Sequence, residues 1–219
     1  MFIVEDCAEA IGSLYKGKHV GQFGDAATYS FFGNKTISTG EGGMVLFKDK
    51  KIYKFASLLR DHGMSKKKKY WHDFIGYNYR LTNLQAAVGV AQMERFEFII
   101  DKKRDIASKY RKILSKTKKI LSLPSDKENC INSFWLYTIL LDPMINRDKV
   151  MEKLINVGVE TRPVFYPLHK MDPYKTFETS KHLVNTNFIS KQGLCLPSSV
   201  SLKNNEIEYI CNELINVIC

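Results

Sequence analysis

The 219-residue sequence predicts an α/β protein. Short apolar segments of strand length alternate with segments whose apolar residues recur at helical spacing, and glycine-containing turns separate several of them. The composition is 44% hydrophobic and 12% aromatic, which is ordinary for a globular protein and excludes a disordered tail. A chain of this length can bury one large core or two small ones.

The first hundred residues alternate predicted strands and helices. A helix over 50–59 is predicted because four apolar residues share one face at helical spacing, namely Ile52, Phe55, Ala56 and Leu59. The expected elements are a buried strand over 2–4, a short helix or turn over 8–14, a strand over 26–32 that ends at Gly33, a strand over 43–47 and a helix over 50–59.

A helical region follows an irregular loop over 60–81. Thr82 and Gln85 have the spacing of a capping box, so we expect a helix that starts there and runs through Met93. Residues 96–116 carry dense charge with isoleucines at helical spacing, which predicts a long helix leaving the first domain. We therefore expect two domains, 1–100 and 101–219.

The second half predicts a small α/β domain. It follows Pro124 and alternates strand and helix patterns. The expected elements are a strand over 134–141, a helix over 148–156 ended by Gly158, an extended stretch over 159–161 and a final helix over 205–217.

The formal net charge of +10 raises the alternative of a nucleic-acid-binding module. The run Lys66–Lys69 followed by Tyr70 and Trp71 would be its basic and aromatic element. However, the lysines are spread through the chain, and no helix-turn-helix, zinc-finger or RNA-binding motif accompanies them. We expect no specific nucleic-acid partner, and the basic chain favours an anionic substrate.

The five cysteines lack disulfide-like or zinc-like spacing. An odd number without CxxC pairs indicates reduced thiols, and we expect neither a disulfide framework nor a metal. No apolar stretch approaches the roughly 20 residues needed to span a bilayer, and the first residues lack the pattern of a signal peptide. These features predict a cytoplasmic protein without a membrane partner.

Lys35 is the strongest candidate for chemistry. It lies between a predicted strand end and the glycine turn Gly40–Gly43, and a lysine held on rigid backbone can form an imine with an aldehyde cofactor. Asp6 ends an apolar strand and could hold a pyridinium nitrogen in its protonated state. A lone lysine beside glycines is most often solvated, and an aspartate at a strand end most often caps a turn. Together the two residues suggest pyridoxal 5'-phosphate.

Several ordered motifs resemble the DegT/DnrJ/EryC1/StrS aminotransferases. They extend from the first residues to a segment near the end and so cover nearly the whole chain. The matching segments are Glu5–Ala10, Ser30–Lys35, Thr39–Gly43, Leu59–Gly63, Gly76–Ala87, Glu160–His169 and Leu194–Ser198.

The resemblance implies the fold-type I, aspartate aminotransferase-like fold of PLP-dependent transferases. Members of the family carry a large additional N-terminal portion, so we expect an incomplete large PLP-binding domain, 1–100, followed by the small C-terminal α/β domain, 101–219. The missing portion supplies the turn that holds the cofactor phosphate and an aromatic residue stacked on the ring. The chain is therefore expected to be a fragment.

The resemblance also assigns roles to individual residues. Lys35 and Asp6 would be catalytic, and lysine rather than histidine at the first of these positions favours transamination over sugar dehydration. Asn78 would reach the cofactor phosphate of a neighbouring subunit, which implies a homodimer with shared sites. The expected cofactor-binding residues are Lys35, Asp6, Glu9, Ser30 and Asn78, and the weaker substrate-binding candidates are His62, Arg80, Arg162, Tyr166 and His169.

The implied activity is amino transfer from glutamate to a nucleotide-linked keto-deoxysugar, with GDP-4-keto-6-deoxymannose as the expected acceptor. The alternative is a truncated, non-catalytic remnant or a subunit that needs a separate N-terminal half. No Walker A motif or GxGxxG fingerprint points to another nucleotide cofactor.

Overall fold

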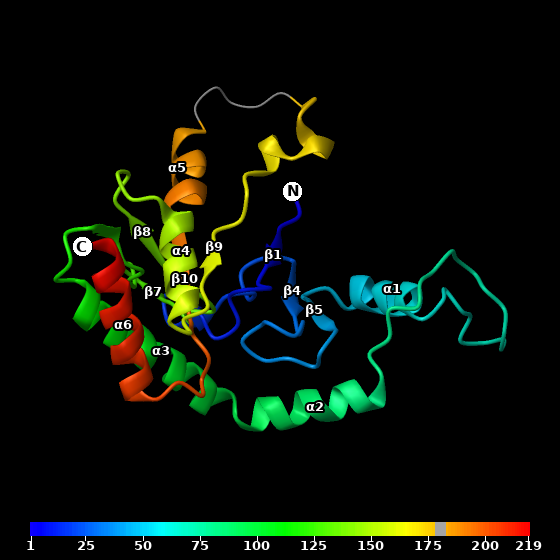
Figure 1. Ribbon diagram of the computed structural model, residues 1–219. Helices are drawn as coiled ribbons and strands as arrows, with labels where there is room; N and C mark the ends of the chain where they lie inside the picture. Colours follow the sequence, from blue (N-terminus) through cyan, green and yellow to red (C-terminus); the bar gives the residue numbers. More distant parts are fainter. Residues whose placement is uncertain (178–182) are drawn as a thin grey trace. The chain divides into compact units, whose positions relative to one another are not determined.

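The computed structural model describes residues 1–177 and 183–219, which divide into two compact units (Figure 1). Unit 1 comprises residues 1–100 and 127–135, and unit 2 comprises 101–126 and 136–219. Residues 127–135 therefore fold with the first unit, whereas the sequence-based division at residue 100 assigned them to the C-terminal domain.

The main sheet of unit 1 has the strand order β1-β4-β5. Strand β1 (Val4–Asp6) runs parallel to β4 (Ala26–Ser30), and β5 (Gly43–Phe47) runs antiparallel to β4. Asp6 is in register with Thr28. Because β1 and β4 are parallel, their carboxyl ends meet at one edge of the sheet, and each strand ends on a polar residue, Asp6 or Ser30.

The prediction of a buried strand over 2–4 is wrong. The strand begins at Val4, and both Phe2 and Val4 are largely exposed, at 78% and 64%. The apolar residues were interpreted as core, but β1 is an edge strand of this sheet and the described residues do not cover it. Strand β4 also ends earlier than expected, at Ser30, where the chain turns into a loop.

A second, small sheet joins residues 127–135 to unit 1. Its order is β3-β2-β7, and Leu14 is in register with Ile131. The strands are only two residues long, which is why no periodicity in the sequence indicated them. They are β2 (Leu14–Tyr15), β3 (Lys18–His19) and β7 (Cys130–Ile131).

The three helices that follow β5 begin where the sequence predicted. Asp49 caps α1 (Lys50–Arg60) by accepting two backbone N–H groups. The predicted capping box is confirmed, because Thr82 accepts from the Gln85 N–H and the Gln85 side chain accepts from the Thr82 N–H at the start of α2 (Asn83–Glu94). Helix α3 (Phe96–Leu114) begins in unit 1 and continues into unit 2.

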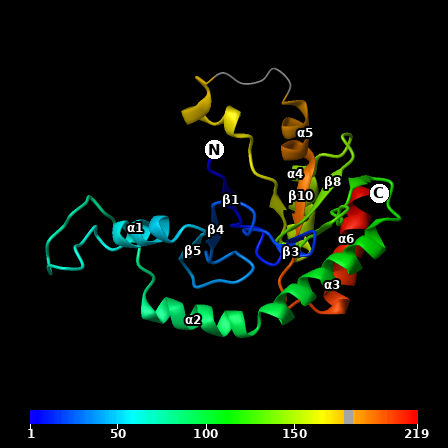
Figure 2. The same ribbon diagram turned by 180° about the vertical axis from the view of Figure 1, so that it is seen from behind.

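Unit 2 contains a four-stranded antiparallel sheet of order β6-β8-β10-β9. Figures 1 and 2 both show α3 and α6 side by side within this unit. The strands are β6 (Ile120–Ser122), β8 (Tyr137–Leu141), β9 (Arg162–Pro163) and β10 (Gly193–Leu196). The helices are α4 (Arg147–Asn156), α5 (Val184–Gln192) and α6 (Asn204–Ile218), with 3-10 turns η1 (Leu168–Lys170) and η2 (Asp172–Tyr174).

The two units differ in how well they bury apolar side chains. In unit 2 every residue of β10 is buried, and Tyr110 packs on Tyr137 with ring centroids 4.9 Å apart. In unit 1, by contrast, helix α2 has no buried residue although it is largely apolar, and Leu84 is 83% exposed. Unit 1 therefore presents apolar surface of the kind that proteins cover with another segment.

No helix in residues 1–177 or 183–219 is both long and apolar enough to cross a membrane. Within the same residues, the histidine, cysteine and acidic side chains form no group of three suited to a metal ion. All five cysteines have free thiols.

Candidate active site

Lys35 lies on a closed loop between β4 and β5. The loop is pinned at its base, because the Phe31 N–H donates to the Gly42 carbonyl and the Thr39 N–H donates to the Phe31 carbonyl, both at 2.9 Å. Ile37, only 2% exposed, anchors the loop in the core. Gly42 has φ +134°, and a Cβ there would lie 2.7 Å from Leu81, so this corner requires glycine. The lysine is thus carried on fixed backbone, as the sequence predicted.

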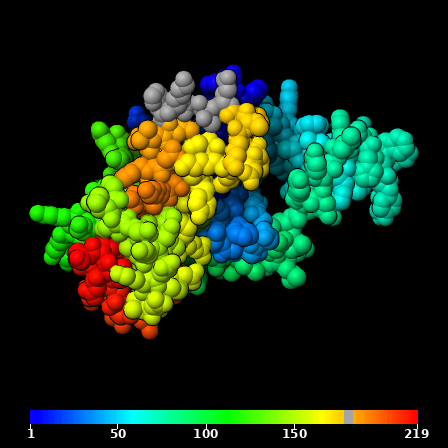
Figure 3. Space-filling view, turned by 45° about the horizontal axis from the view of Figure 1, so that its top comes forward, coloured from blue at the N-terminus to red at the C-terminus, as the bar shows by residue number. Residues whose placement is uncertain are grey.

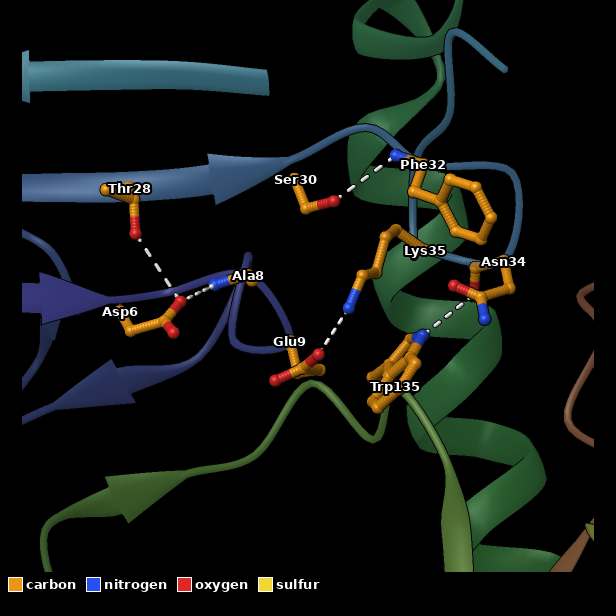
Figure 4. Close-up of polar contacts among 9 residues, drawn as sticks. All are labelled: Asp6, Ala8, Glu9, Thr28, Ser30, Phe32, Asn34, Lys35 and Trp135. Atoms are coloured by element: carbon orange, nitrogen blue, oxygen red, sulfur yellow. Dashed lines mark hydrogen bonds and ion pairs between the residues drawn. The ribbon is translucent and has the colours of Figure 1, made fainter. Parts of the chain in front are cut away.

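The Lys35 side chain makes two contacts that hold its amine (Figure 4). Its Nζ forms an ion pair with Glu9 Oε1 and lies 4.3 Å from the centroid of the Trp135 ring. The lysine side chain is 12% exposed and that of Glu9 is 50% exposed. The Lys35 amine is therefore largely shielded from water, whereas the carboxylate of its partner Glu9 remains half accessible to solvent.

Asp6 and Ser30 are the last residues of the two parallel strands, β1 and β4 (Figure 4). Asp6 Oδ1 accepts from the Ala8 N–H at 3.1 Å and from the Thr28 hydroxyl at 3.4 Å. Ser30 Oγ accepts from the Phe32 N–H at 3.3 Å. Both side chains thus make the local turn contacts that an ordinary strand end would use, and these contacts fix them beside the lysine loop.

Cys7 follows Asp6, and its N–H donates to the Thr28 carbonyl at 2.9 Å. It is 2% exposed, and burial raises the pKa of its thiol, with the Glu5 and Asp6 charges adding to the effect. A thiol in these surroundings stays neutral and does not compete with Lys35 as a nucleophile.

His62, Asn78 and Arg80 lie together in the loop after α1. His62 has φ +61°, its N–H donates to the Tyr77 carbonyl at 2.9 Å, and His72 Nδ1 donates to its carbonyl at 2.9 Å. Arg80 Nε donates to Asn78 Oδ1 at 3.4 Å. The loop therefore brings three of the predicted residues close together, through the Asp61–Asn78 backbone bridge and the Arg80–Asn78 side-chain bond.

The predicted basic run Lys66–Lys69 lies at the surface of the same loop (Figure 3). Lys68 stacks over Trp71 with its Nζ 4.1 Å from the ring centroid, and Lys69 lies over Tyr70 at 5.0 Å. These are short-range contacts between neighbours in sequence, as expected for a solvated loop.

The remaining predicted residues belong to unit 2. Arg162 lies in β9, opposite Cys195 of β10, and its side chain is exposed. Tyr166 is 66% exposed, and His169 Nε2 lies 3.2 Å from Asn187 Oδ1. All three residues lie in unit 2, and their substrate-binding role stays a prediction.

Trp135 is the site residue that sequence reasoning missed. It was assigned to the start of a C-terminal strand, but the structure places it in unit 1, where its Nε1–H donates to the Asn34 carbonyl at 2.8 Å. The residues that the structure brings together are Asp6, Glu9, Ser30, Lys35 and Trp135 (Figure 4). Trp135 joins this group only through contacts with residues about a hundred positions earlier in the sequence, which a reading of local patterns does not detect.

The family model for DegT/DnrJ/EryC1/StrS aminotransferases matches residues 1–215. The chain belongs to this family. GDP-perosamine synthases of Escherichia coli O157:H7 and Vibrio cholerae are 42% and 43% identical to it over 214 and 218 residues. The structure of Helicobacter pylori PseC, an aminotransferase involved in the biosynthesis of pseudoaminic acid, has a TM-score of 0.92 to this chain at 26% identity.

These relatives and the structural neighbour are longer than this chain. The two synthase matches cover 98% and 99% of the chain but 57% and 59% of the relatives, and the PseC match covers 100% of the chain and 60% of PseC. The chain thus spans about three-fifths of the length of the relatives it matches. The predicted family and the fold class, a fold-type I aminotransferase fold of which part is present, are both confirmed.

Proposed function

We propose that this chain carries the lysine-bearing part of a PLP-dependent site that transfers an amino group to a nucleotide-linked keto-deoxysugar. The observation that supports this most strongly is the grouping of Lys35, Glu9, Asp6 and Ser30 at the carboxyl ends of β1 and β4. In open α/β sheets, ligands bind outside the carboxyl ends of the strands. Family membership identifies the class of ligand to test.

The residues present fit PLP. The cofactor offers an aldehyde, a ring nitrogen and a phosphate, and the site offers an amine, a carboxylate and a hydroxyl at one sheet edge. Lys35 would take the aldehyde, and Ser30 would bind the phosphate. Both observed bonds to Asp6 end on Oδ1, and we assign Oδ2 to the ring nitrogen.

The proposed roles follow from where each side chain lies. When bound, PLP supplies an electron sink for the carbon that carries the amino group. Glu9 orients the Lys35 amine through their ion pair, and the amine loses its proton to water before it takes the aldehyde. Lys35 Nζ then takes a proton from the donor and returns it to the acceptor. Asp6 keeps a negative charge beside the ring nitrogen throughout.

GDP-4-keto-6-deoxymannose is the acceptor we propose, with glutamate as the donor. The two relatives named GDP-perosamine synthase support this choice over other nucleotide sugars. The net charge of +10 is consistent with a substrate that carries a diphosphate. The side chains proposed to contact it are His62, Arg80, Arg162, Tyr166 and His169.

A second candidate role is that of a subunit that acts only together with another polypeptide, or of a non-catalytic remnant. The exposed apolar faces of unit 1 favour it, because helix α2 buries none of its residues and β5 exposes Met44, Val45 and Leu46. A polypeptide corresponding to the preceding part of a GDP-perosamine synthase is the partner we propose to cover these faces. A homodimer in which Asn78 reaches the neighbouring cofactor phosphate would complete the site.

The proposed setting is the cytoplasm. Free thiols at all five cysteines are consistent with a reducing compartment. The proposed partners are small molecules and protein subunits, with no role for nucleic acid or a membrane.

The test is an acceptor assay with glutamate, PLP and GDP-4-keto-6-deoxymannose, followed by mass spectrometry of the nucleotide sugar. The chain is assayed alone and after co-expression with the preceding part of the E. coli O157:H7 synthase. Amino-sugar formation by wild type but not by Lys35→Arg supports the proposed activity, and formation only after co-expression supports the subunit role. No product in either preparation, with both folded, would refute the aminotransferase proposal.

A further inference from the structure

Trp135 contacts Lys35 and the residue before it, Asn34, in two independent ways. Its ring centroid lies 4.3 Å from Lys35 Nζ, and its Nε1–H donates at 2.8 Å to the carbonyl of Asn34, the residue just before the lysine (Figure 4). One contact acts on the amine and the other on the backbone that carries it. A side chain packed near the loop only to fill space would need neither.

The segment that carries Trp135 is itself anchored to unit 1. Strand β7 pairs with β2, the Ser133 N–H donates to Ser13 Oγ at 3.1 Å, and the two serine hydroxyls are 3.0 Å apart. Phe134, the neighbour of Trp135, is 5% exposed. The backbone before Trp135 is thus fixed both by strand pairing and by side-chain hydrogen bonds.

An ammonium over an indole face is stabilised electrostatically, most strongly when water is excluded. The Lys35 side chain is 12% exposed, so this contact acts in partly dry surroundings. The indole lies beside the amine and Glu9 accepts from it, so that the direction of the lysine side chain is set from two sides.

We propose that Trp135 is a positioning residue for Lys35. Its ring holds the amine toward Glu9 and the edge of the sheet, and its N–H fixes the peptide before the lysine. This inference rests on the proposed function, because it assigns Trp135 the task of orienting the amine that takes the cofactor aldehyde.

The contact itself is tested by NMR of protein labelled with 13C-lysine. The indole ring current is expected to move the Lys35 ε-CH2 signal away from the other lysines, with Lys35→Arg providing the assignment. Trp135→Leu is expected to return the signal to the common position, and Trp135→Phe to keep part of the displacement. Trp71→Leu is the matched control, because it removes an equally close indole from Lys68. An undisplaced Lys35 signal in wild type would overturn the proposal.

The positioning role is tested by the rate at which borohydride traps PLP on each lysine, read by peptide mass spectrometry. The amine condenses with the aldehyde with loss of water, and borohydride reduces the resulting bond. The Trp135 N–H bond to Asn34 holds the peptide that carries Lys35, and loss of a hydrogen bond worth about 0.5–1 kcal/mol predicts about two- to fivefold slower trapping at Lys35 in Trp135→Leu. Trp135→Phe also lacks this N–H and is expected to be slowed to a similar extent. Trp71→Leu is expected to leave Lys35 unchanged.

The two readouts separate the inference from the proposed function. Displaced Lys35 signals together with slower trapping in Trp135→Leu support both. Equal or faster trapping at Lys35 in folded Trp135→Leu overturns the positioning role and leaves the proposed function standing. No trapping at Lys35 in wild type, with the NMR displacement present, contradicts PLP binding by this chain and, with it, the positioning role. If Trp135→Leu does not fold, Trp135→Phe serves as the test variant. A Lys35 NMR signal and a trapping rate that are both the same in Trp135→Phe as in wild type would then contradict the proposed indole contact.

Discussion

Lys35 and Glu9 form an ion pair across 26 residues of sequence, joining the loop after β4 to the turn after β1. The pairing is unequal in exposure, because the lysine side chain is 12% exposed and the glutamate 50%. The more shielded member carries the amine, and the more accessible member carries the carboxylate that orients it. This relationship distinguishes Lys35 from the many solvated lysines of the chain.

Glu9→Gln is expected to keep the chain folded and to speed the reaction of Lys35 with PLP. A half-exposed ion pair contributes only about 0.2–1 kcal/mol, so urea unfolding should change little. The Glu9 charge stabilises the Lys35 ammonium, whereas the neutral amine reacts with the aldehyde, so removing that charge is expected to speed borohydride trapping at Lys35 by up to about fivefold. Glu41→Gln, on the same loop as Lys35, is the control. Equal trapping rates in wild type and Glu9→Gln would show that the Glu9 charge does not act on the Lys35 amine.

The stability of the chain is expected to depend on unit 2 more than on α2. Leu214 of α6 is fully buried, and Leu214→Ala should lower the free energy of unfolding by about 2–5 kcal/mol. Leu84 of α2 is 83% exposed, so Leu84→Ala should change it by less than about 0.5 kcal/mol. Urea unfolding followed by circular dichroism measures both. A large loss in Leu84→Ala would mean that α2 is covered in solution, for example by a second copy.

Burial lowers the pKa of Lys103 to about 8. Its Nζ donates to the Ser198 carbonyl at 3.1 Å. Between pH 8 and the ordinary value of 10.5 the unfolded chain binds more protons at this residue, so the free energy of unfolding should rise with pH across that window. Lys103→Met should remove that part of the rise, as measured by urea unfolding at pH 7 to 10. The same slope in both proteins would contradict a buried, readily deprotonated lysine.

Glu5 is expected to make unit 1 sensitive to acid. Burial raises the pKa of Glu5, but backbone N–H donors at Gly24, Gly21 and Phe23, with Lys48, outweigh it and hold the pKa below its ordinary value of 4.5. The stabilisation is present above that value and is lost as the pH falls through the lower folded-state pKa. Glu5→Gln should therefore be less stable at pH 7 and lose less on acidification. Urea unfolding at several pH values measures both effects. An equal loss of free energy of unfolding in wild type and Glu5→Gln as the pH falls would contradict this role.

Much of the fold could be predicted because its signals are local. Strand β5 and helix α2 have the predicted starting points, since a short apolar run and a capping box need only neighbouring residues. The two-residue strands of the small sheet and the fully buried β10 could not be identified, because tertiary pairing defines them. Phe2 was misread since apolar character alone does not show whether anything covers a strand.

The site was predictable to a similar extent. Motifs that the chain shares with its family identified Asp6, Glu9, Ser30 and Lys35, and the structure brings these four together. Trp135 could not be found, because its contact with Lys35 depends on how β7 pairs with β2 and no local pattern encodes that pairing.

The central claim is that Lys35 can take PLP, and the most direct measurement is the visible absorption spectrum of the purified chain with PLP. Wild type and Lys35→Ala are compared before and after borohydride. We expect wild type to show a band that borohydride abolishes while leaving the cofactor bonded to Lys35, and Lys35→Ala to show none. A folded wild-type chain without the band, or an equal band in Lys35→Ala, would contradict the claim.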